Sequence, residues 1–153
     1  MGFIAPNEIS STNSLLISRP YLIKTIPDPG EMASSTVVYR MVGCRFKYTP
    51  VMSTTLDITV LCNTQQDIPN TGSNTQICYG TGTPPALNDT FTGTQVGNIF
   101  VNATAAGIDT QHVICTAIVP VVINTSYWFD LSSKSRSGGN TTYTNIYICI
   151  KEI

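Results

Sequence analysis

Residues 56–63, Leu-Asp-Ile-Thr-Val-Leu-Cys-Asn, alternate apolar and polar side chains for most of their length. Apolar side chains stand at positions 56, 58, 60 and 62, and polar ones stand at 57, 59 and 63. A period of two is typical of a β-strand with one face on a core and the other in water, because successive side chains point to opposite faces. This stretch therefore predicts a half-buried strand.

Similar short strand signals recur on both sides of this stretch, separated by Gly, Asn and Pro turn residues. No window keeps a helical period of 3.6 residues together with capping residues. We therefore predict an all-β fold, an antiparallel, jelly-roll-like β-sandwich of about eight strands with little helix. The run 112–119 is almost continuously apolar and predicts a central strand. The other strands are expected at residues 36–40, 44–48, 76–79, 96–103, 127–132 and 145–153.

The first 35 residues differ from the rest, because proline and glycine interrupt their short apolar pieces. Proline lacks a backbone N–H, which confines strands that contain it to sheet edges. We expect residues 1–35 to form an extended N-terminal arm with one or two edge strands, and residues 36–153 to form the sandwich domain. The arm either wraps the domain or reaches a neighbour, or its strands pair within their own sheet.

The composition suits a surface that other proteins cover. Of the 153 residues, 42% are hydrophobic and only 11% are charged, which is less than half the usual quarter. Solubility then rests on hydroxyl and amide groups, as on a surface covered by neighbouring subunits or on an exposed virion or extracellular surface. The net charge of −1 comes without a Lys/Arg cluster, so we expect neither nucleic acid nor membrane as a partner.

Five cysteines, at positions 44, 62, 78, 115 and 149, form no C-x-x-C pair. An odd number of widely spaced cysteines in apolar runs favours buried, reduced thiols over a disulfide framework. The first residues lack the basic and apolar segments of a secretory signal. We therefore expect the chain to fold in a reducing cytoplasm.

No residues form a recognisable catalytic or metal-binding motif. His112 is the single histidine, which removes the usual zinc sites and His-based nucleophile systems, and the aspartates are scattered along the chain. Gly80-Thr81-Gly82 lacks the lysine and the helix of a phosphate-binding loop. We predict that the chain is not an enzyme, with no catalytic residue, metal or cofactor.

The segment Tyr127-Trp128-Phe129-Asp130 concentrates aromatic side chains in one predicted strand. Strand parity places Tyr127 and Phe129 on one face, which favours core packing over a sugar-stacking platform. Trp128 points to the other face, at a subunit interface or in the core. Asp130 is either an outward-facing residue or an acceptor for a neighbouring donor. The candidate interface or ligand contacts are Trp128, Asp130, Thr81, Thr83 and Tyr21.

Six short motifs follow one another from residue 48 to the end of the chain. They are Tyr48-Thr49-Pro50, residues 79–86 (Tyr-Gly-Thr-Gly-Thr-Pro-Pro-Ala), residues 92–97 (Thr-Gly-Thr-Gln-Val-Gly), residues 127–131 (Tyr-Trp-Phe-Asp-Leu), Gly138-Gly139 and Lys151-Glu152-Ile153. Over residues 40–153 their order resembles that in small β-rich virion proteins and fibre domains of tailed phages and related viruses. No single motif is specific, so the resemblance rests on the order.

This resemblance implies a jelly-roll-like sandwich, usually assembled into trimers, on the outside of a virus particle, and it brings no catalytic residues. The five cysteines depart from the family's pattern, and the N-terminal arm has no counterpart in it. We interpret the chain as a virion structural protein assembled in the host cytoplasm. It would be a head-decoration, cement or minor capsid component that contacts the major capsid protein or neighbouring subunits. The alternatives are a tail-fibre or receptor-binding knob for a host-surface glycan, and a small jelly-roll hydrolase.

Overall fold

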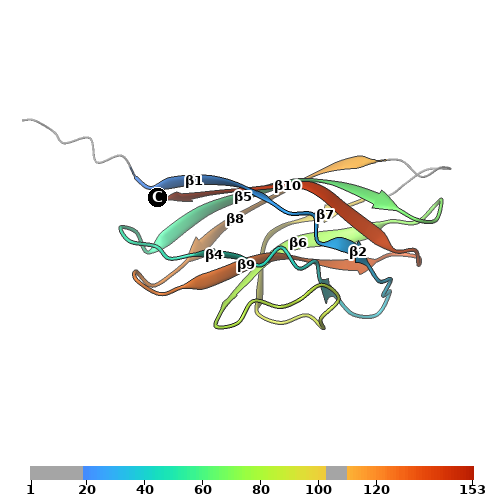
Figure 1. Cartoon of the computed structure of the whole chain (residues 1–153), viewed down its shortest axis with the longest axis horizontal. Coiled ribbons are helices and arrows are strands. Elements are labelled where there is room, and N and C mark those ends of the chain that lie inside the picture. Colours follow the sequence, from blue (N-terminus) through green and yellow to red (C-terminus); the bar gives the residue numbers. More distant parts are fainter. Residues whose placement is uncertain (1–18, 103–109) are drawn as a thin grey trace, which may run out of the picture.

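The computed structural model describes residues 19–102 and 110–153, and these residues form β-strands and loops with no helix. Figure 1 shows the strands arranged in two layers. The strands are β1 (Tyr21–Ile26), β2 (Gly30–Met32), β3 (Arg40–Met41), β4 (Phe46–Tyr48), β5 (Thr55–Gln66), β6 (Ser73–Thr81), β7 (Thr94–Val101), β8 (Gln111–Pro120), β9 (Tyr127–Ser135) and β10 (Thr141–Glu152).

The described strands build two five-stranded antiparallel sheets. Sheet A has the order β1-β10-β5-β8, and β2 pairs with β10 beyond the end of β1. Sheet B has the order β3-β9-β6-β7, and β4 pairs with β9 next to β3. β1 and β2 thus share one position beside β10, and β3 and β4 share one position beside β9. The ten strands therefore occupy eight positions in the sandwich.

The pairing is nested along the chain. β1 and β2 pair with β10, β3 and β4 with β9, β5 with β8, and β6 with β7, and successive pairs alternate between sheet A and sheet B. A long antiparallel ribbon rolled into two layers gives this pattern, which is that of a jelly roll. The structure therefore confirms the predicted all-β sandwich.

The segment Pro27-Asp28-Pro29 separates β1 from β2, which begins at Gly30. The two prolines supply no backbone N–H, and Gly30 has a φ of 103°, a conformation that favours glycine. Of the predicted N-terminal arm, residues 21–26 and 30–32 pair with β10 in sheet A. Residues 1–18 lie outside the described part of the chain.

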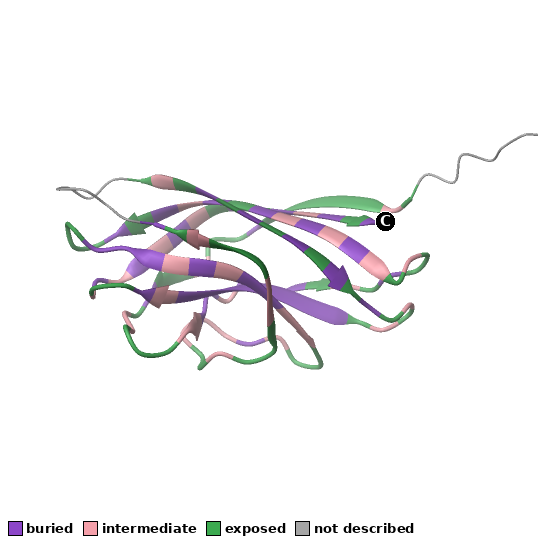
Figure 2. Ribbon diagram, turned by 180° about the vertical axis from the view of Figure 1, so that it is seen from behind, coloured by how far each residue is buried: buried purple, intermediate pink, exposed green. Residues whose placement is uncertain are grey.

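The core lies between the two sheets and follows the period of two. In β5 the side chains of Leu56, Ile58 and Val60 are buried, and their neighbours are more exposed (Figure 2). Tyr127 and Phe129 also belong to this core, as their shared parity predicted. All five cysteines are free thiols, and all but the half-buried Cys149 are buried.

The predicted central strand at residues 112–119 is wrong in position, because β8 ends the strand order of sheet A. Its apolar character comes from two faces in different surroundings. Val113 and Cys115 point into the core, whereas Ile114 and Ile118 are 53% and 59% exposed on the outer face of the sheet.

One side of the sandwich is closed where β7 crosses β8. The Asn98 side chain accepts a hydrogen bond from the Thr116 N–H (2.6 Å) and donates one to the Ile114 carbonyl (3.2 Å). Its amide therefore makes the backbone hydrogen bonds that a neighbouring strand would make with β8. Gly97 permits this approach, because a Cβ built on it would lie 1.9 Å from the Thr116 carbonyl oxygen, and its φ is 76°.

We expect Gly97→Ala to lower the free energy of unfolding by more than about 3 kcal/mol, because the new methyl group must push β7 away from β8. Gly82→Ala is the matched control, since Gly82 also has a positive φ but nothing lies within 4 Å of its Cβ position. That control should lose only about 1–2 kcal/mol of stability, which is the cost of a positive φ for a residue that has a Cβ. Urea denaturation measures the free energy of unfolding of both variants. Equal losses would show that the close approach of residue 97 to Thr116 does not require glycine.

Candidate interaction surface

Trp128 lies on the outer face of sheet B and not in the main core. Its side chain packs with Met41, Cys78 and Phe91 and is only 3% exposed. The indole Nε1 donates a hydrogen bond to the Thr81 carbonyl oxygen at 3.0 Å. The polar edge of the ring therefore already has a partner within the chain.

Two glycines let the loop between β6 and β7 cover the indole. A Cβ built on Gly80 would lie 2.5 Å from Cζ2 of Trp128, and one built on Gly93 would lie 2.5 Å from its Cη2. Thr81 lies exposed at the end of β6, and Thr83 lies exposed at the start of this loop. The glycine-rich segment and the tryptophan, which are far apart in the sequence, thus belong to one structural unit.

Asp130 has the same parity as Trp128 and fastens the connection between β3 and β4 to β9. Its carboxylate accepts hydrogen bonds from the backbone N–H groups of Gly43 (3.1 Å), Cys44 (2.9 Å) and Leu131 (2.7 Å). The side chain is 3% exposed. Burial raises the pKa of Asp130 from 3.8 to about 6, although the hydrogen bonds from Cys44, Leu131 and Gly43 oppose the shift.

Glu152 fastens a second loop, next to the end of β10. Its carboxylate accepts hydrogen bonds from the N–H groups of Val51 (2.9 Å), Met52 (2.6 Å) and Ser53 (2.6 Å), and from the Tyr48 hydroxyl (2.8 Å). Burial alone would raise the pKa of Glu152, but these hydrogen bonds outweigh it and hold the pKa below its ordinary value. The sequence analysis named Glu152 only within the motif Lys151-Glu152-Ile153 and predicted no contact for it.

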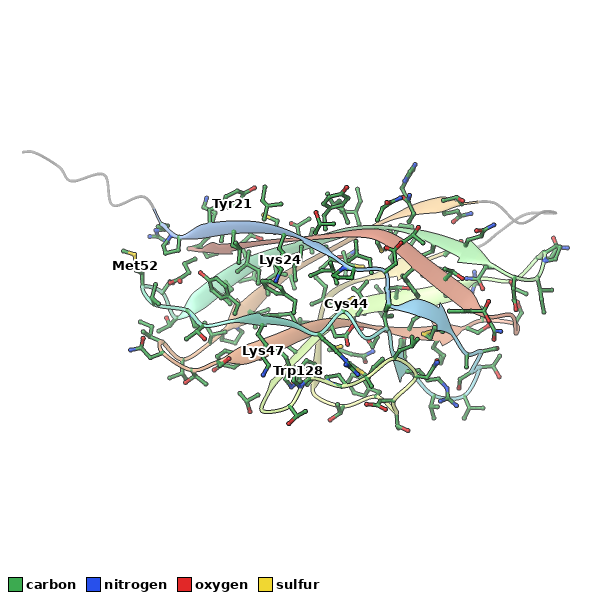
Figure 3. All side chains as sticks on the ribbon, viewed as in Figure 1. Tyr21, Lys24, Cys44, Lys47, Met52 and Trp128 are labelled. Atoms are coloured by element: carbon green, nitrogen blue, oxygen red, sulfur yellow. The ribbon has the colours of Figure 1, made fainter. Side chains whose placement is uncertain are left out.

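The five predicted contact residues fall into two separate places. Trp128, Asp130 and Thr81 lie together on sheet B, with Thr83 beside them on the covering loop. Tyr21 lies on β1 in sheet A and is 60% exposed. Figure 3 shows Tyr21 and Trp128 on opposite sides of the sandwich.

An exposed apolar surface, which the sequence analysis missed, covers the outer face of sheet A. The strand register places Tyr147, Leu61 and Ile114 side by side on β10, β5 and β8, and they are 44%, 43% and 53% exposed. Tyr21 and Ile23 extend this surface on β1, and Ile118 extends it on β8. We call these six residues the outer apolar face. The signal for it was Leu61, which interrupts the alternation of residues 56–63.

A shallow hollow opens at one end of the outer apolar face. Leu61, Ile114 and Tyr147 contribute apolar walls, and Asn63, His112 and Asn145 contribute polar ones. Nδ1 of His112 lies 2.7 Å from Oδ1 of Asn63, its cross-strand neighbour. The histidine is therefore held by an amide at the surface of the sheet.

The described residues contain no cluster of three or more His, Cys, Asp or Glu side chains that could hold a metal ion. Of the scattered aspartates, Asp89 accepts a hydrogen bond from the Ala86 N–H within its own loop, and Asp109 lies outside the described residues. Within residues 19–102 and 110–153 there is also no helix that could span a membrane.

The chain is thus a jelly-roll β-sandwich with one outer face covered by its own loop and the other apolar and exposed. Solved structures of virus particles contain chains with this type of fold. Within the residues that are compared, the likeness is one of β-sandwich fold.

The similar chains come from infectious bursal disease virus. A chain of its Gx strain has a TM-score of 0.52 and 14% identity, covering 88% of this chain and 32% of that chain. A chain of its T13 viral particle has a TM-score of 0.54 and 12% identity, with 88% and 32% covered. A chain of its Gt strain has a TM-score of 0.52 and 11% identity, with 88% and 34% covered.

At these identities the likeness concerns the fold alone, and this chain spans about a third of the length of each similar chain. No protein-family model matches the sequence, and no curated protein is significantly similar to it. The likeness supports the β-sandwich fold, whereas the resemblance to phage decoration and fibre proteins stays a prediction.

We expect Asp130→Asn to change how stability depends on pH. Because the folded pKa of about 6 lies above the ordinary 3.8, the folded wild type retains a proton that the unfolded chain releases between these values. Its stability therefore falls as the pH rises through this window, by roughly 3 kcal/mol from Asp130. Asparagine does not ionise, so the variant should gain that amount relative to wild type between pH 3.8 and pH 6.

Urea denaturation at a series of pH values measures this difference. The loss of one carboxylate oxygen can shift the stability of Asp130→Asn at every pH, but that offset does not vary with pH. Wild-type and variant curves that run parallel from pH 3.8 to pH 6 would contradict the assignment of the raised pKa to Asp130.

Proposed function

We propose that the chain is a structural subunit of a virus particle, of the head-decoration, cement or minor capsid type, and that it acts through protein–protein contacts and not through catalysis. The observation that carries this proposal is the outer apolar face on a capsid-type sandwich. The proposed location is the virion, after assembly in the host cytoplasm.

The outer apolar face supports a contact with another protein. Its six side chains belong to four neighbouring strands, β1, β10, β5 and β8, and Tyr147, Leu61 and Ile114 form an unbroken row across three of them. A contiguous apolar surface of this kind marks a binding site more often than scattered exposed residues do. Lys151 and Asp57 lie beside each other between Tyr21 and Ile118, and they add polar groups of the kind that protein interfaces usually have at their rim.

The low content of charge supports the same proposal. Only 11% of the residues are charged, and charged side chains are depleted at the centres of protein interfaces. The proposed partners are the major capsid protein or neighbouring copies of this chain. The trimeric state that the sequence resemblance implies stays a prediction.

The burial of Trp128 weighs against the glycan-binding alternative. Stacking on a sugar needs an exposed aromatic face, whereas the covering loop leaves the indole 3% exposed. The exposed Thr81 and Thr83 remain as candidate contacts on that loop. We therefore place the proposed contact with other virion proteins on sheet A.

A charge on the outer apolar face should prevent incorporation into particles. We expect Ile114→Lys to reduce the amount of the chain that sediments with particles purified from producing cells by about tenfold, because an ammonium group would be buried against the partner. Quantitative mass spectrometry of the particle fraction measures the ratio of this chain to the main shell protein.

Ile99→Lys is the matched control, because Ile99 is 51% exposed, like Ile114 at 53%, but lies on β7 of sheet B. It should be incorporated at the wild-type level. Absence of the wild-type chain from particles would refute the proposed function. Incorporation of Ile114→Lys at the wild-type level would refute the outer apolar face as the contact.

A further inference from the structure

One end of the sandwich exposes large apolar side chains. Val51, Met52, Val122 and Ile153 are 56%, 47%, 63% and 36% exposed. Val51 and Met52 belong to the loop between β4 and β5, and Val122 belongs to the loop between β8 and β9. Figure 3 shows Met52 at the same end of the sandwich as Tyr21, with which β1 begins. We call these four exposed residues the apolar end.

Hydrogen bonds hold the two loops of the apolar end side by side. The Val121 N–H donates to the Thr54 carbonyl (2.9 Å), and the Asn124 N–H donates to the Pro50 carbonyl (2.8 Å). The N–H groups of residues 51–53 donate to the Glu152 carboxylate. Because these N–H groups already have partners, the apolar end offers side chains and not a strand edge. It therefore suits a segment that contributes apolar side chains.

The chain enters the sandwich beside the apolar end. The Pro20 carbonyl accepts a hydrogen bond from the Glu152 N–H (3.1 Å), and Tyr21 lies opposite Lys151 in the register of β1 and β10. Figure 1 shows the start of β1 and the end of β10 at the same end of the sandwich. Glu152 thus binds both Pro20 and the loop that carries Met52. The residues that precede Pro20 therefore start next to the apolar end.

The sequence has an apolar run just before this entry point. Residues 15–17 are Leu-Leu-Ile, and Ser18 and Arg19 connect them to Pro20. An extended chain spans about 3.3 Å per residue, so the run can reach from about 10 Å to about 17 Å beyond Pro20. Two packed sheets lie about 10 Å apart. The run is therefore long enough to cross this end of the sandwich over both loops.

We infer that Leu15, Leu16 and Ile17 pack on the apolar end of their own chain. The exposed loops, the point at which β1 begins and the short connection support this contact, although residues 15–17 lie outside the described part of the chain. The contact goes beyond the proposed function and does not depend on it, because the contact with other virion proteins is proposed on the outer apolar face of sheet A.

The short connection favours this segment over a second copy or another protein. A segment on a short linker has an effective concentration of about a millimolar, whereas a separate molecule binds only at its own concentration. Charge agrees with this occupant. Residues 15–17 carry no charged side chain, and neither do the four residues of the apolar end, so the contact would bury no unpaired charge.

Oxidation of Met52 by dilute hydrogen peroxide tests the contact in the full chain, and peptide mass spectrometry measures its rate. Methionine oxidation follows exposure, so residues 15–17 should protect Met52 when they cover it. The triple variant Leu15→Ser, Leu16→Ser and Ile17→Ser should oxidise at Met52 at least about threefold faster than the wild type, because serine cannot replace the apolar contact.

Two controls accompany this measurement. Met32 and Met41 are 1% and 0% exposed, so they should oxidise slowly in every variant, which checks that the fold is intact. The double variant Phe3→Ser and Ile4→Ser is the matched control, because it also replaces apolar residues with serine but far from Pro20 in the sequence. It should leave the oxidation rate of Met52 at the wild-type value.

Dilution distinguishes a contact within one chain from a contact between copies. Protection by the chain's own segment should not change over about a hundredfold dilution, because its effective concentration is fixed by the linker. Equal oxidation rates of Met52 in the wild type and the triple variant would overturn the inference. Protection that is lost on dilution, or an equal effect of the matched control, would also overturn it. The isolated chain is used without particles, so failure here is distinct from failure of the proposed function, which particle incorporation measures.

Discussion

The structure depends on one constraint of β-sandwiches, which is that the edge strands of each sheet carry backbone groups in need of partners. The chain meets this constraint differently at each edge. Gly97 lets β7 approach β8 so closely that the Asn98 amide can bind the β8 backbone. Residues 88–91 pair with β3, whereas no described strand pairs along the outer sides of β1 and β7. The covered edges thus leave fewer places where a strand of another chain could pair.

The two outer faces of the sandwich also differ in whether the chain itself covers them. The loop between β6 and β7 folds over Trp128 and gives sheet B its own cover, which only glycine at positions 80 and 93 permits. Sheet A has no such cover among the described residues, and Tyr147, Leu61 and Ile114 form a row on its surface. The apolar residues of the chain are therefore divided between a core, a small covered cluster and a surface suited to a partner.

Two buried carboxylates connect loops to strands. Asp130 holds the β3–β4 connection through the N–H groups of Gly43 and Cys44, and Glu152 holds residues 51–53. Their pKa values shift in opposite directions, because burial prevails at Asp130 and hydrogen bonding prevails at Glu152. Both acids thus hold loops against strands within the fold.

The sequence by itself determined the class of fold, because a period of two is a local property that residues 56–63 show without reference to any other strand. It also determined that Tyr127 and Phe129 share one face and that Trp128 lies on the other. Only the tertiary structure decided what each face meets. The indole is covered because Gly93, distant in sequence, comes to lie against it, and because Gly80, its cross-strand neighbour on β6, leaves room for the ring. The strand at 112–119 stands at the end of its sheet although its pattern favoured the centre. Pairing partners, edges and covers depend on contacts between distant segments, and local periodicity carries no information about them.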